Sequence, residues 1–385
     1  MRIEVLAVPP GAAALDLLPR LALALEGGHP VAPYAVGSPP PDLPPHGDAD
    51  LPADLAVVVG TSGSTGVPKR AMLTAANLRS SIDATAARLG GHGQWLLTVP
   101  AHHIAGLQVL LRSVVAGTTP DVLDTSHGFT PASWTTAVDA MAPTQGPTVV
   151  SLVPTQLTRL LADDAATERL ARFSAVLVGG AATHPDLLAR ATVAGVTAVT
   201  TYGMSETAGG CVYDGRPLDG TSVELDADGR ISVVGPTVAA GYLGDPARTS
   251  DAFPRPGTFR TDDVGHVDDD GRLHVDGRVD DLVNTGGLKV APRLVEEAVA
   301  RLDGIREAVA VGIPDPEWGE VMAVAVVTAP GSTAPTVGGL RDQLRGILAD
   351  AALPRAVREV DAIPARGPGK PDRQAIRALF ATVGE

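Results

Sequence analysis

The chain has 385 residues, 44% of them hydrophobic, which is enough for two or three domains with buried cores. Its formal net charge of -14 argues against a general binder of nucleic acid or anionic membranes, because the long-range field repels phosphates. The single cysteine, Cys211, cannot form an internal disulfide, and we find no signal peptide and no apolar run of about 18 residues. These features predict a cytoplasmic protein.

The first half of the chain alternates between strands and helices. A strand is expected at Ile3–Val8 and an amphipathic helix at Ala12–Leu25, followed by a proline-rich surface connection at Ser38–Pro45. Further strands are expected at Leu55–Val59, Trp95–Val99, Val149–Val153, Ala175–Val178 and Val196–Thr201, and helices at Leu78–Leu89, Ile104–Val115, Thr155–Leu161 and Pro185–Ala194. The first of these helices has Thr74 as its candidate N-cap. This alternation predicts a mostly parallel sheet covered on both faces.

The pattern changes after Thr201. Two Asp-Gly pairs, at Asp228 and Asp270, lie between short apolar segments and predict hairpins of a small antiparallel unit. That unit would close a large N-terminal α/β domain, residues 1–279. Residues 280–385 predict a small, mobile α+β domain with a helix at Pro292–Leu302, strands at Ala308–Val311 and Val321–Val327, and helices near Val337–Leu348 and Gln374–Phe380.

A phosphate-binding loop is predicted directly after the strand Leu55–Val59. Its glycines allow a tight backbone turn, its N–H and hydroxyl groups can donate to phosphate oxygens, and a lysine adds positive charge. A P-loop of the nucleotide-triphosphatase type is excluded because no Gly-Lys-Ser/Thr ends the segment. The alternative is a flexible surface loop. The candidate residues are Thr61, Ser62, Gly63, Ser64, Thr65, Gly66 and Lys69.

This loop resembles the phosphate loop of the adenylate-forming superfamily, which contains acyl-CoA synthetases, adenylation domains and luciferases. Four later segments resemble the superfamily's adenine and metal segment, ribose segment, interdomain hinge and catalytic-lysine loop, in that order: Tyr202–Thr207, Phe259–Gly265, Gly277–Lys289 and Pro364–Lys370. The resemblance implies an enzyme that activates a carboxylic acid with ATP and Mg²⁺ and then transfers the acyl group to the thiol of coenzyme A.

The resemblance also assigns the nucleotide contacts. Glu206 offers the hard carboxylate oxygen that Mg²⁺ prefers, and Tyr202 offers a ring for adenine. Asp263, chosen by register over Asp262, would bind the ribose. The alternatives are a strand-to-helix turn with a solvated glutamate and a cluster of aspartates at a hairpin. The further nucleotide-binding candidates are Gly180, Ala181, Gly203, Met204, Ser205, Thr207 and Arg278.

Four residues of the C-terminal part receive roles from the same resemblance. Asp280 matches the pivot of the small domain, and Gly287 and Lys289 match positions beside the pantetheine arm of coenzyme A. Lys370 matches the catalytic lysine, whose ammonium would stabilise charge between the attacking carboxylate and the α-phosphate. The alternatives are a turn aspartate and a solvated loop lysine.

The acid site is predicted around a histidine segment, Pro100–Gly106. His103 would orient the substrate carboxylate, and Thr155, Gly180 and Ser205 would line the acyl pocket. Arg112 lies in an otherwise apolar helix, where a charge must be paired or reach water. It predicts either an anchor for a second substrate carboxylate or an arginine that reaches the surface.

Together these segments most resemble the o-succinylbenzoate–CoA ligases of menaquinone biosynthesis, in a compact actinobacterial form. The alternatives are another aryl- or fatty-acyl-CoA ligase, an adenylation enzyme that loads a carrier protein, and a non-catalytic nucleotide-binding regulator. The expected partners are a small carboxylic acid, ATP and coenzyme A, with neither nucleic acid nor a membrane. The resemblance weakly favours a homodimer.

Overall fold

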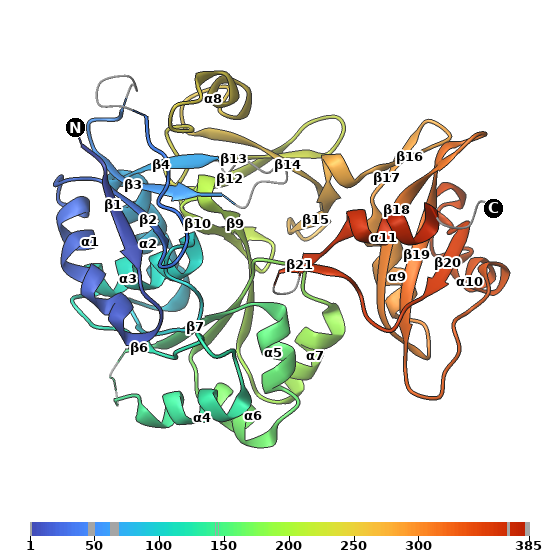
Figure 1. Ribbon diagram of the computed structural model, residues 1–385, viewed down its shortest axis with the longest axis horizontal. Helices are drawn as coiled ribbons and strands as arrows, with labels where there is room; N and C mark the ends of the chain where they lie inside the picture. Colours follow the sequence, from blue (N-terminus) through green and yellow to red (C-terminus); the bar gives the residue numbers. More distant parts are fainter. Residues whose placement is uncertain are drawn as a thin grey trace. The chain divides into compact units, whose positions relative to one another are not determined.

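Figure 1 shows the computed structural model, which describes residues 2–44, 51–61, 69–142, 144, 146–367 and 370–381. The chain divides into two compact units. One contains Met1–Glu224, Ser232–Thr261 and Asp269–Leu273, and the other contains Leu225–Ile231, Asp262–Asp268 and His274–Glu385. A domain boundary at residue 280 stays a prediction.

The N-terminal sheet has the order β1-β2-β3-β4. Its strands are β1 (Glu4–Val8), β2 (Val31–Ala35), β3 (Leu55–Gly60) and β4 (Arg70–Thr74), of which the first three are parallel. The expected first helix begins as a 3-10 helix over Gly11–Leu17 and continues as α1 (Leu18–Leu25). Strands β2 and β4 were not expected; β2 contains Pro33, which argues against a strand.

The central sheet confirms the expected parallel architecture. Its order is β11-β10-β9-β8-β7-β5-β6, and the strands from β9 to β6 are parallel while β10 and β11 are antiparallel. The bounds are β5 (Gln94–Leu97), β6 (Asp121–Val122), β7 (Thr148–Leu152), β8 (Ala175–Val178), β9 (Ala198–Met204), β10 (Gly209–Tyr213) and β11 (Arg216–Pro217).

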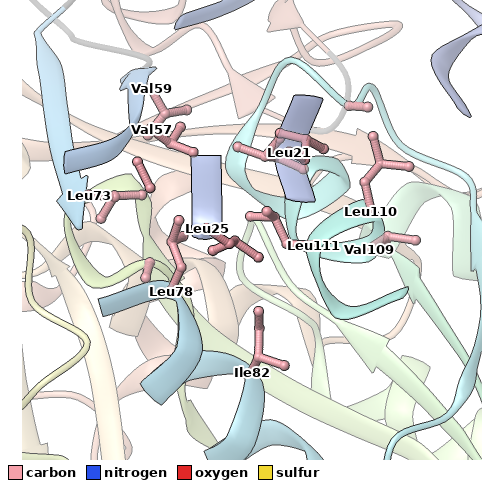
Figure 2. Packing of buried hydrophobic residues seen from close by; sticks show 14 of the residues in the cluster. Leu21, Leu25, Val57, Val59, Leu73, Leu78, Ile82, Val109, Leu110 and Leu111 are labelled. Atoms are coloured by element: carbon pink, nitrogen blue, oxygen red, sulfur yellow. The ribbon is translucent and has the colours of Figure 1, made fainter. Parts of the chain in front are cut away.

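Helices cover both faces of this central sheet. Helix α1 contacts strands of the N-terminal sheet, α2 (Ala75–Leu89) contacts strands of both sheets, and α3 (Ile104–Ala116) contacts strands of the central sheet. Helices α4 (Pro131–Ala140), α5 (Pro154–Leu160), α6 (Asp164–Leu170) and α7 (Pro185–Val193) pack on the other face of the central sheet. Because side chains alternate along a strand, Leu97 joins the first core and Leu96 the second. Figure 2 shows the first core, where Leu21 of α1 and Leu111 of α3 meet Leu78 of α2.

Both expected Asp-Gly hairpins are found. A four-stranded sheet has the order β12-β13-β14-β15 and consists of β12 (Ser222–Leu225), β13 (Arg230–Val234), β14 (Thr258–Val267) and β15 (Leu273–Arg278), with α8 (Pro246–Ala252) between β13 and β14. Gly229 and Gly271 occupy the turns with φ of 76° and 73°, a backbone conformation that favours glycine.

The C-terminal part is α+β, as expected. Its main sheet has the order β17-β16-β19-β18, with β20 parallel to β19. Val295 and Leu340 pack on one face, and Ile376 packs with Val311 in a separate core. The elements are β16 (Val283–Thr285), β17 (Leu288–Val290), α9 (Pro292–Ala300), β18 (Ile305–Asp315), β19 (Gly319–Thr328), α10 (Val337–Leu344), β20 (Ala356–Glu359), β21 (Ala365–Gly367), β22 (Lys370–Pro371) and α11 (Arg373–Ala381). Within the described ranges, no helix has the length and hydropathy needed to cross a membrane.

Candidate active site

The carboxyl edge of the central sheet brings together four segments predicted to bind ligands. His103 precedes α3 after β5, Thr155 lies in α5 after β7, Gly180 follows β8, and Tyr202 lies near the end of β9. Because these strands are parallel, their carboxyl ends lie at one edge, where α/β proteins build their sites. The topology therefore assembles a candidate site from segments that are about 100 residues apart.

One boundary at this edge differs from the prediction. Strand β9 continues to Met204 instead of ending at Thr201, because its last residues pair with β10: Gly203 opposes Gly210, and Met204 opposes Gly209. A Cβ on Gly203 would lie 2.1 Å from the carbonyl oxygen of Gly209, so only glycine fits here. Tyr202 is consequently fixed in a strand and does not lie in a loop.

The ends of the predicted phosphate loop lie beside this segment. The Thr61 N–H donates to the Lys69 carbonyl over 2.8 Å, which closes the loop at its base on β3 and β4. The Ser205 hydroxyl donates to the Gly60 carbonyl over 3.4 Å. The predicted phosphate contacts Ser62, Gly63, Ser64, Thr65 and Gly66 lie outside the described residues.

Glu206 is a buried carboxylate that accepts a hydrogen bond from a tyrosine. Its side chain is 6% exposed, and the Tyr242 hydroxyl donates to its Oε1 over 2.8 Å. The ammonium of Lys69 lies 5.4 Å from the centre of the Tyr242 ring. Tyr242 lies outside the segments predicted to bind ligands, although the scarcity of tyrosine, four in the whole chain, is a signal that could have directed attention to it.

The donor set around Glu206 fits a metal that arrives on a nucleotide. No group of three metal-ligating side chains occurs among the residues that the structure describes. Mg²⁺ keeps several waters and is usually held by one or two carboxylates together with substrate phosphates. A single buried carboxylate beside a phosphate loop therefore suits Mg²⁺ bound to ATP.

Thr207 holds the turn that carries Glu206. Its hydroxyl donates to the carbonyls of Gly209, over 2.8 Å, and Met204, over 3.2 Å, and accepts from the Met204 N–H over 3.0 Å. Thr207 is fully buried, and the next residue, Ala208, has a φ of 53°. These contacts position Glu206, and the predicted contact of Thr207 with the nucleotide stays a prediction.

The two adjacent histidines differ in their surroundings. His103 is exposed at the start of α3, whereas half-buried His102 has its pKa lowered to about 4 by burial and by the charge of His103. His102 is therefore neutral at pH 7. The ring centroids lie 4.1 Å apart.

Arg112 is buried, so the expectation that it reaches the surface is wrong. Its guanidinium lies 4.6 Å from the centre of the Trp95 ring and donates to the Thr85 hydroxyl over 3.2 Å. Burial lowers its pKa, and Tyr213 opposes that shift. Its Nε has no hydrogen-bond partner among the described residues. Trp95, Thr85 and Tyr213 come from three separate elements, which the helix pattern alone could not indicate.

The predicted ribose segment lies on β14, and its two aspartates, Asp262 and Asp263, belong to the second unit. Asp262 accepts from Arg230 over 2.8 Å and from Arg278 over 3.4 Å. Asp263 is 14% exposed, and its Oδ1 lies 3.7 Å from Arg278. Two arginines thus engage Asp262, and the choice of Asp263 for the ribose stays a prediction.

The remaining predicted residues lie in turns and short strands of the second unit. Asp280 is in the middle of a 3-10 turn, Val279–Asp281, that joins β15 to β16. Gly287 forms the β16–β17 turn with a φ of 82°, and Lys289 is exposed on β17. The backbone of Lys370 lies in β22, and its side chain lies outside the described atoms.

Comparison with known proteins decides the family. A model of the AMP-binding enzymes matches residues 19–243, and a model of the AMP-binding enzyme C-terminal domain matches residues 294–370. The chain belongs to the AMP-binding enzymes. The resemblance to the adenylate-forming superfamily is thereby confirmed, and with it the expectation of an enzyme that binds ATP.

Three relatives illustrate how far this similarity extends. A probable 2-succinylbenzoate–CoA ligase from Mycobacterium tuberculosis is 43% identical over 97% of this chain and 97% of its own length. A feruloyl-CoA synthase from Amycolatopsis is 33% identical over 89% of this chain and 72% of that protein. The o-succinylbenzoate CoA synthetase from Bacillus subtilis, solved with an acyl-adenylate intermediate, has a TM-score of 0.73 at 22% identity, covers 97% and 87% of the two chains, and shares the fold.

Proposed function

We propose that this protein is an o-succinylbenzoate–CoA ligase of menaquinone biosynthesis. It would react o-succinylbenzoate with ATP to form the acyl-adenylate and pyrophosphate, and the thiol of coenzyme A would then displace AMP to form the thioester. The observation that carries the proposal is the 43% identity to the mycobacterial ligase over nearly the full length of both chains.

The arrangement of the site supports the nucleotide roles that the resemblance implies. Glu206 would hold the Mg²⁺ that accompanies ATP, and Lys69 would neutralise phosphate charge at the end of its loop. Tyr202, at the sheet edge, would contact adenine, and Asp263 would accept hydrogen bonds from the ribose. Removing the buried Glu206 carboxylate should therefore weaken binding of Mg²⁺–ATP more than binding of the acid.

The acid would bind between the histidine segment and the start of α5. His103 would orient the carboxylate that is activated, and Thr155, Gly180 and Ser205 would line the pocket. We further propose that Arg112 attracts the second carboxylate of the substrate. The unsatisfied Nε supports this role, because a buried N–H without an acceptor costs about 1–3 kcal/mol.

The second unit would supply the groups for catalysis and thiol transfer. Lys370 would stabilise the charge that builds between the attacking carboxylate and the α-phosphate. Asp280 would be the pivot of a domain rotation between the two half-reactions. Gly287 and Lys289 would lie along coenzyme A. We also propose a cytoplasmic location. We further propose a homodimer, and light scattering of the purified protein would measure its molar mass.

The deciding experiment incubates purified protein with ATP, Mg²⁺, coenzyme A and a panel of acids that includes o-succinylbenzoate and ferulate. We expect AMP and o-succinylbenzoyl-CoA by mass spectrometry, with both products formed about 100 to 1,000 times more slowly by the Lys370→Ala variant. Ferulate is included because of the 33% identical feruloyl-CoA synthase. Preferential formation of feruloyl-CoA would keep the reaction class and overturn the substrate.

A further inference from the structure

Tyr242 contacts both charged side chains of the nucleotide site in the first unit. Its hydroxyl donates to Glu206 Oε1 over 2.8 Å, and the ammonium of Lys69 lies 5.4 Å from its ring centre. Tyr242 is 4% exposed and Glu206 is 6% exposed, so water screens these interactions only weakly. One residue therefore connects the proposed metal ligand to the end of the phosphate loop.

The position of the Tyr242 backbone is fixed by its neighbours. Its N–H donates to the Thr249 hydroxyl over 2.9 Å, and its backbone forms an antiparallel bridge with Ala71 of β4. The next residue, Leu243, donates its N–H to the Arg70 carbonyl over 2.8 Å. The Tyr242 backbone is thus anchored to β4, the strand that begins directly after Lys69.

The Tyr242 ring and the Glu206 backbone are also held in place. The ring packs edge-on against Phe253, with centroids 5.3 Å apart. The carbonyl of Glu206 accepts from the Ala239 N–H over 2.8 Å, and Thr207 holds the turn that follows. A rigid donor that faces a rigidly mounted carboxylate restricts the orientations which that carboxylate can adopt.

We propose that Tyr242 is a positioning residue for Mg²⁺–ATP, a role that rests on the nucleotide site of the proposed function. Its hydroxyl orients the Glu206 carboxylate toward the metal on the nucleotide, and its ring holds the Lys69 ammonium at the phosphate loop through a cation–π interaction. The hydroxyl therefore affects metal binding through Glu206, and the ring affects phosphate binding through Lys69.

This division of roles gives different expectations for two variants. Tyr242→Phe keeps the ring and removes only the hydroxyl, so Lys69 keeps its contact while Glu206 loses its donor. Tyr242→Leu removes both. Tyr213→Phe is the matched control, because Tyr213 is 1% exposed and its hydroxyl lies 3.2 Å from the Thr85 hydroxyl in the core. A purely structural role would make Tyr242→Phe and Tyr213→Phe behave alike.

The test measures the dissociation constants of Mg²⁺–ATP and of metal-free ATP in EDTA by titration calorimetry, without acid or coenzyme A. The dissociation constant of metal-free ATP divided by that of Mg²⁺–ATP reports the contribution of the metal to binding. We expect Tyr242→Phe to reduce this ratio about 10-fold, the lower end of what outer partners of metal ligands contribute, and to leave the affinity for metal-free ATP unchanged. Tyr242→Leu should weaken the binding of metal-free ATP as well, and Tyr213→Phe should have the wild-type dissociation constants.

Two results would overturn the proposal: a wild-type ratio in Tyr242→Phe, or an equal loss in Tyr213→Phe. Melting temperatures of all variants identify losses that come from unfolding. Because no acid is present, a protein that binds Mg²⁺–ATP and does not convert o-succinylbenzoate would refute the proposed substrate alone. A wild-type protein that binds no ATP would refute both proposals.

Discussion

Arg373 donates to Glu296 in the C-terminal part, with 2.7 Å between Nη1 and Oε1. The same guanidinium lies 3.6 Å from Asp281, next to the predicted pivot, and Arg373 begins α11 just three residues after Lys370. Burial by itself would lower the pKa of Arg373, but the charges of Glu296 and Asp281 raise it overall. One arginine therefore ties the predicted hinge to the base of the catalytic-lysine loop.

We expect Arg373→Ala to lower stability by roughly 2 kcal/mol, because Glu296 loses a partner at a mostly buried position. Adenylation should slow as well, since the base of the Lys370 loop is no longer fixed. Urea unfolding and pyrophosphate exchange measure the two effects. Arg373→Lys should recover part of the stability, whereas an unchanged adenylation rate in a folded Arg373→Ala protein would argue against the coupling.

The lysines of the second unit should separate the two half-reactions. Lys370→Ala should slow adenylation by a factor of about 100 to 1,000, because one preorganised cation is removed from the developing charge. Thioester formation from added acyl-adenylate should remain. Lys289→Ala should do the opposite: a normal pyrophosphate exchange with a raised KM for coenzyme A. Loss of both half-reactions in either variant would contradict this assignment.

Substitution of Arg112 should change the KM for the acid and leave the KM for ATP unchanged. Arg112→Met keeps most of the buried volume, and it should raise the KM for o-succinylbenzoate about 10-fold or more, since hydrogen bonds to charged groups contribute roughly 1.5–3 kcal/mol. The KM for ATP should not change, and neither should the KM for benzoylpropanoate, which lacks the ring carboxylate. Equal increases in KM for both acids would show that Arg112 supports the fold and does not bind the second carboxylate.

Cys211 should be chemically inert in the native protein. Its thiol is fully buried, and burial raises its pKa to about 12. Because the thiolate is the reactive form, a disulfide reagent at pH 8 should label the native chain very slowly and the urea-unfolded chain at once. Rapid labelling without denaturant would mean that β10 opens locally.

The sequence predicted the elements whose own residues form a recognisable pattern. It did not predict strands whose existence or length depends on pairing with another strand. The parallel strands β5 and β8 have continuous apolar runs, and Thr74 caps α2 in a capping box with Asn77, as a local signal should. Strand β2 contains Pro33, and β9 gains three residues only by pairing with β10. Their lengths depend on contacts that no local window contains.

The candidate site shows the same division. Glu206, Lys69 and His103 belong to ordered motifs, so a single sequence was sufficient to find them. Tyr242 lies in none of the segments singled out in the sequence, and its proposed role comes from a carboxylate 36 residues away. The partners of Arg112 likewise come from three elements, so neither the burial of this charge nor its open Nε could be predicted from an apolar helix.

Substitution of Gly106 would test whether the start of α3 must lie close to the preceding loop. A Cβ at this position would lie 2.5 Å from the Pro100 carbonyl oxygen and 2.7 Å from that of Val99. Both obstacles are backbone atoms, so Gly106→Ala should push the helix away, cost about 1–3 kcal/mol and displace His103. The KM for the acid should rise more than the KM for ATP.

Gly117, at the other end of the same helix, is the control. It has a φ of 68° and no atom within 4 Å of an added Cβ, so Gly117→Ala should cost about 1 kcal/mol through backbone strain alone. Because that strain is far along the helix from His103, the KM for the acid should stay at the wild-type value. If both variants raise this KM equally, the effect follows from loss of helix stability and the close approach at Gly106 has no specific role in placing His103.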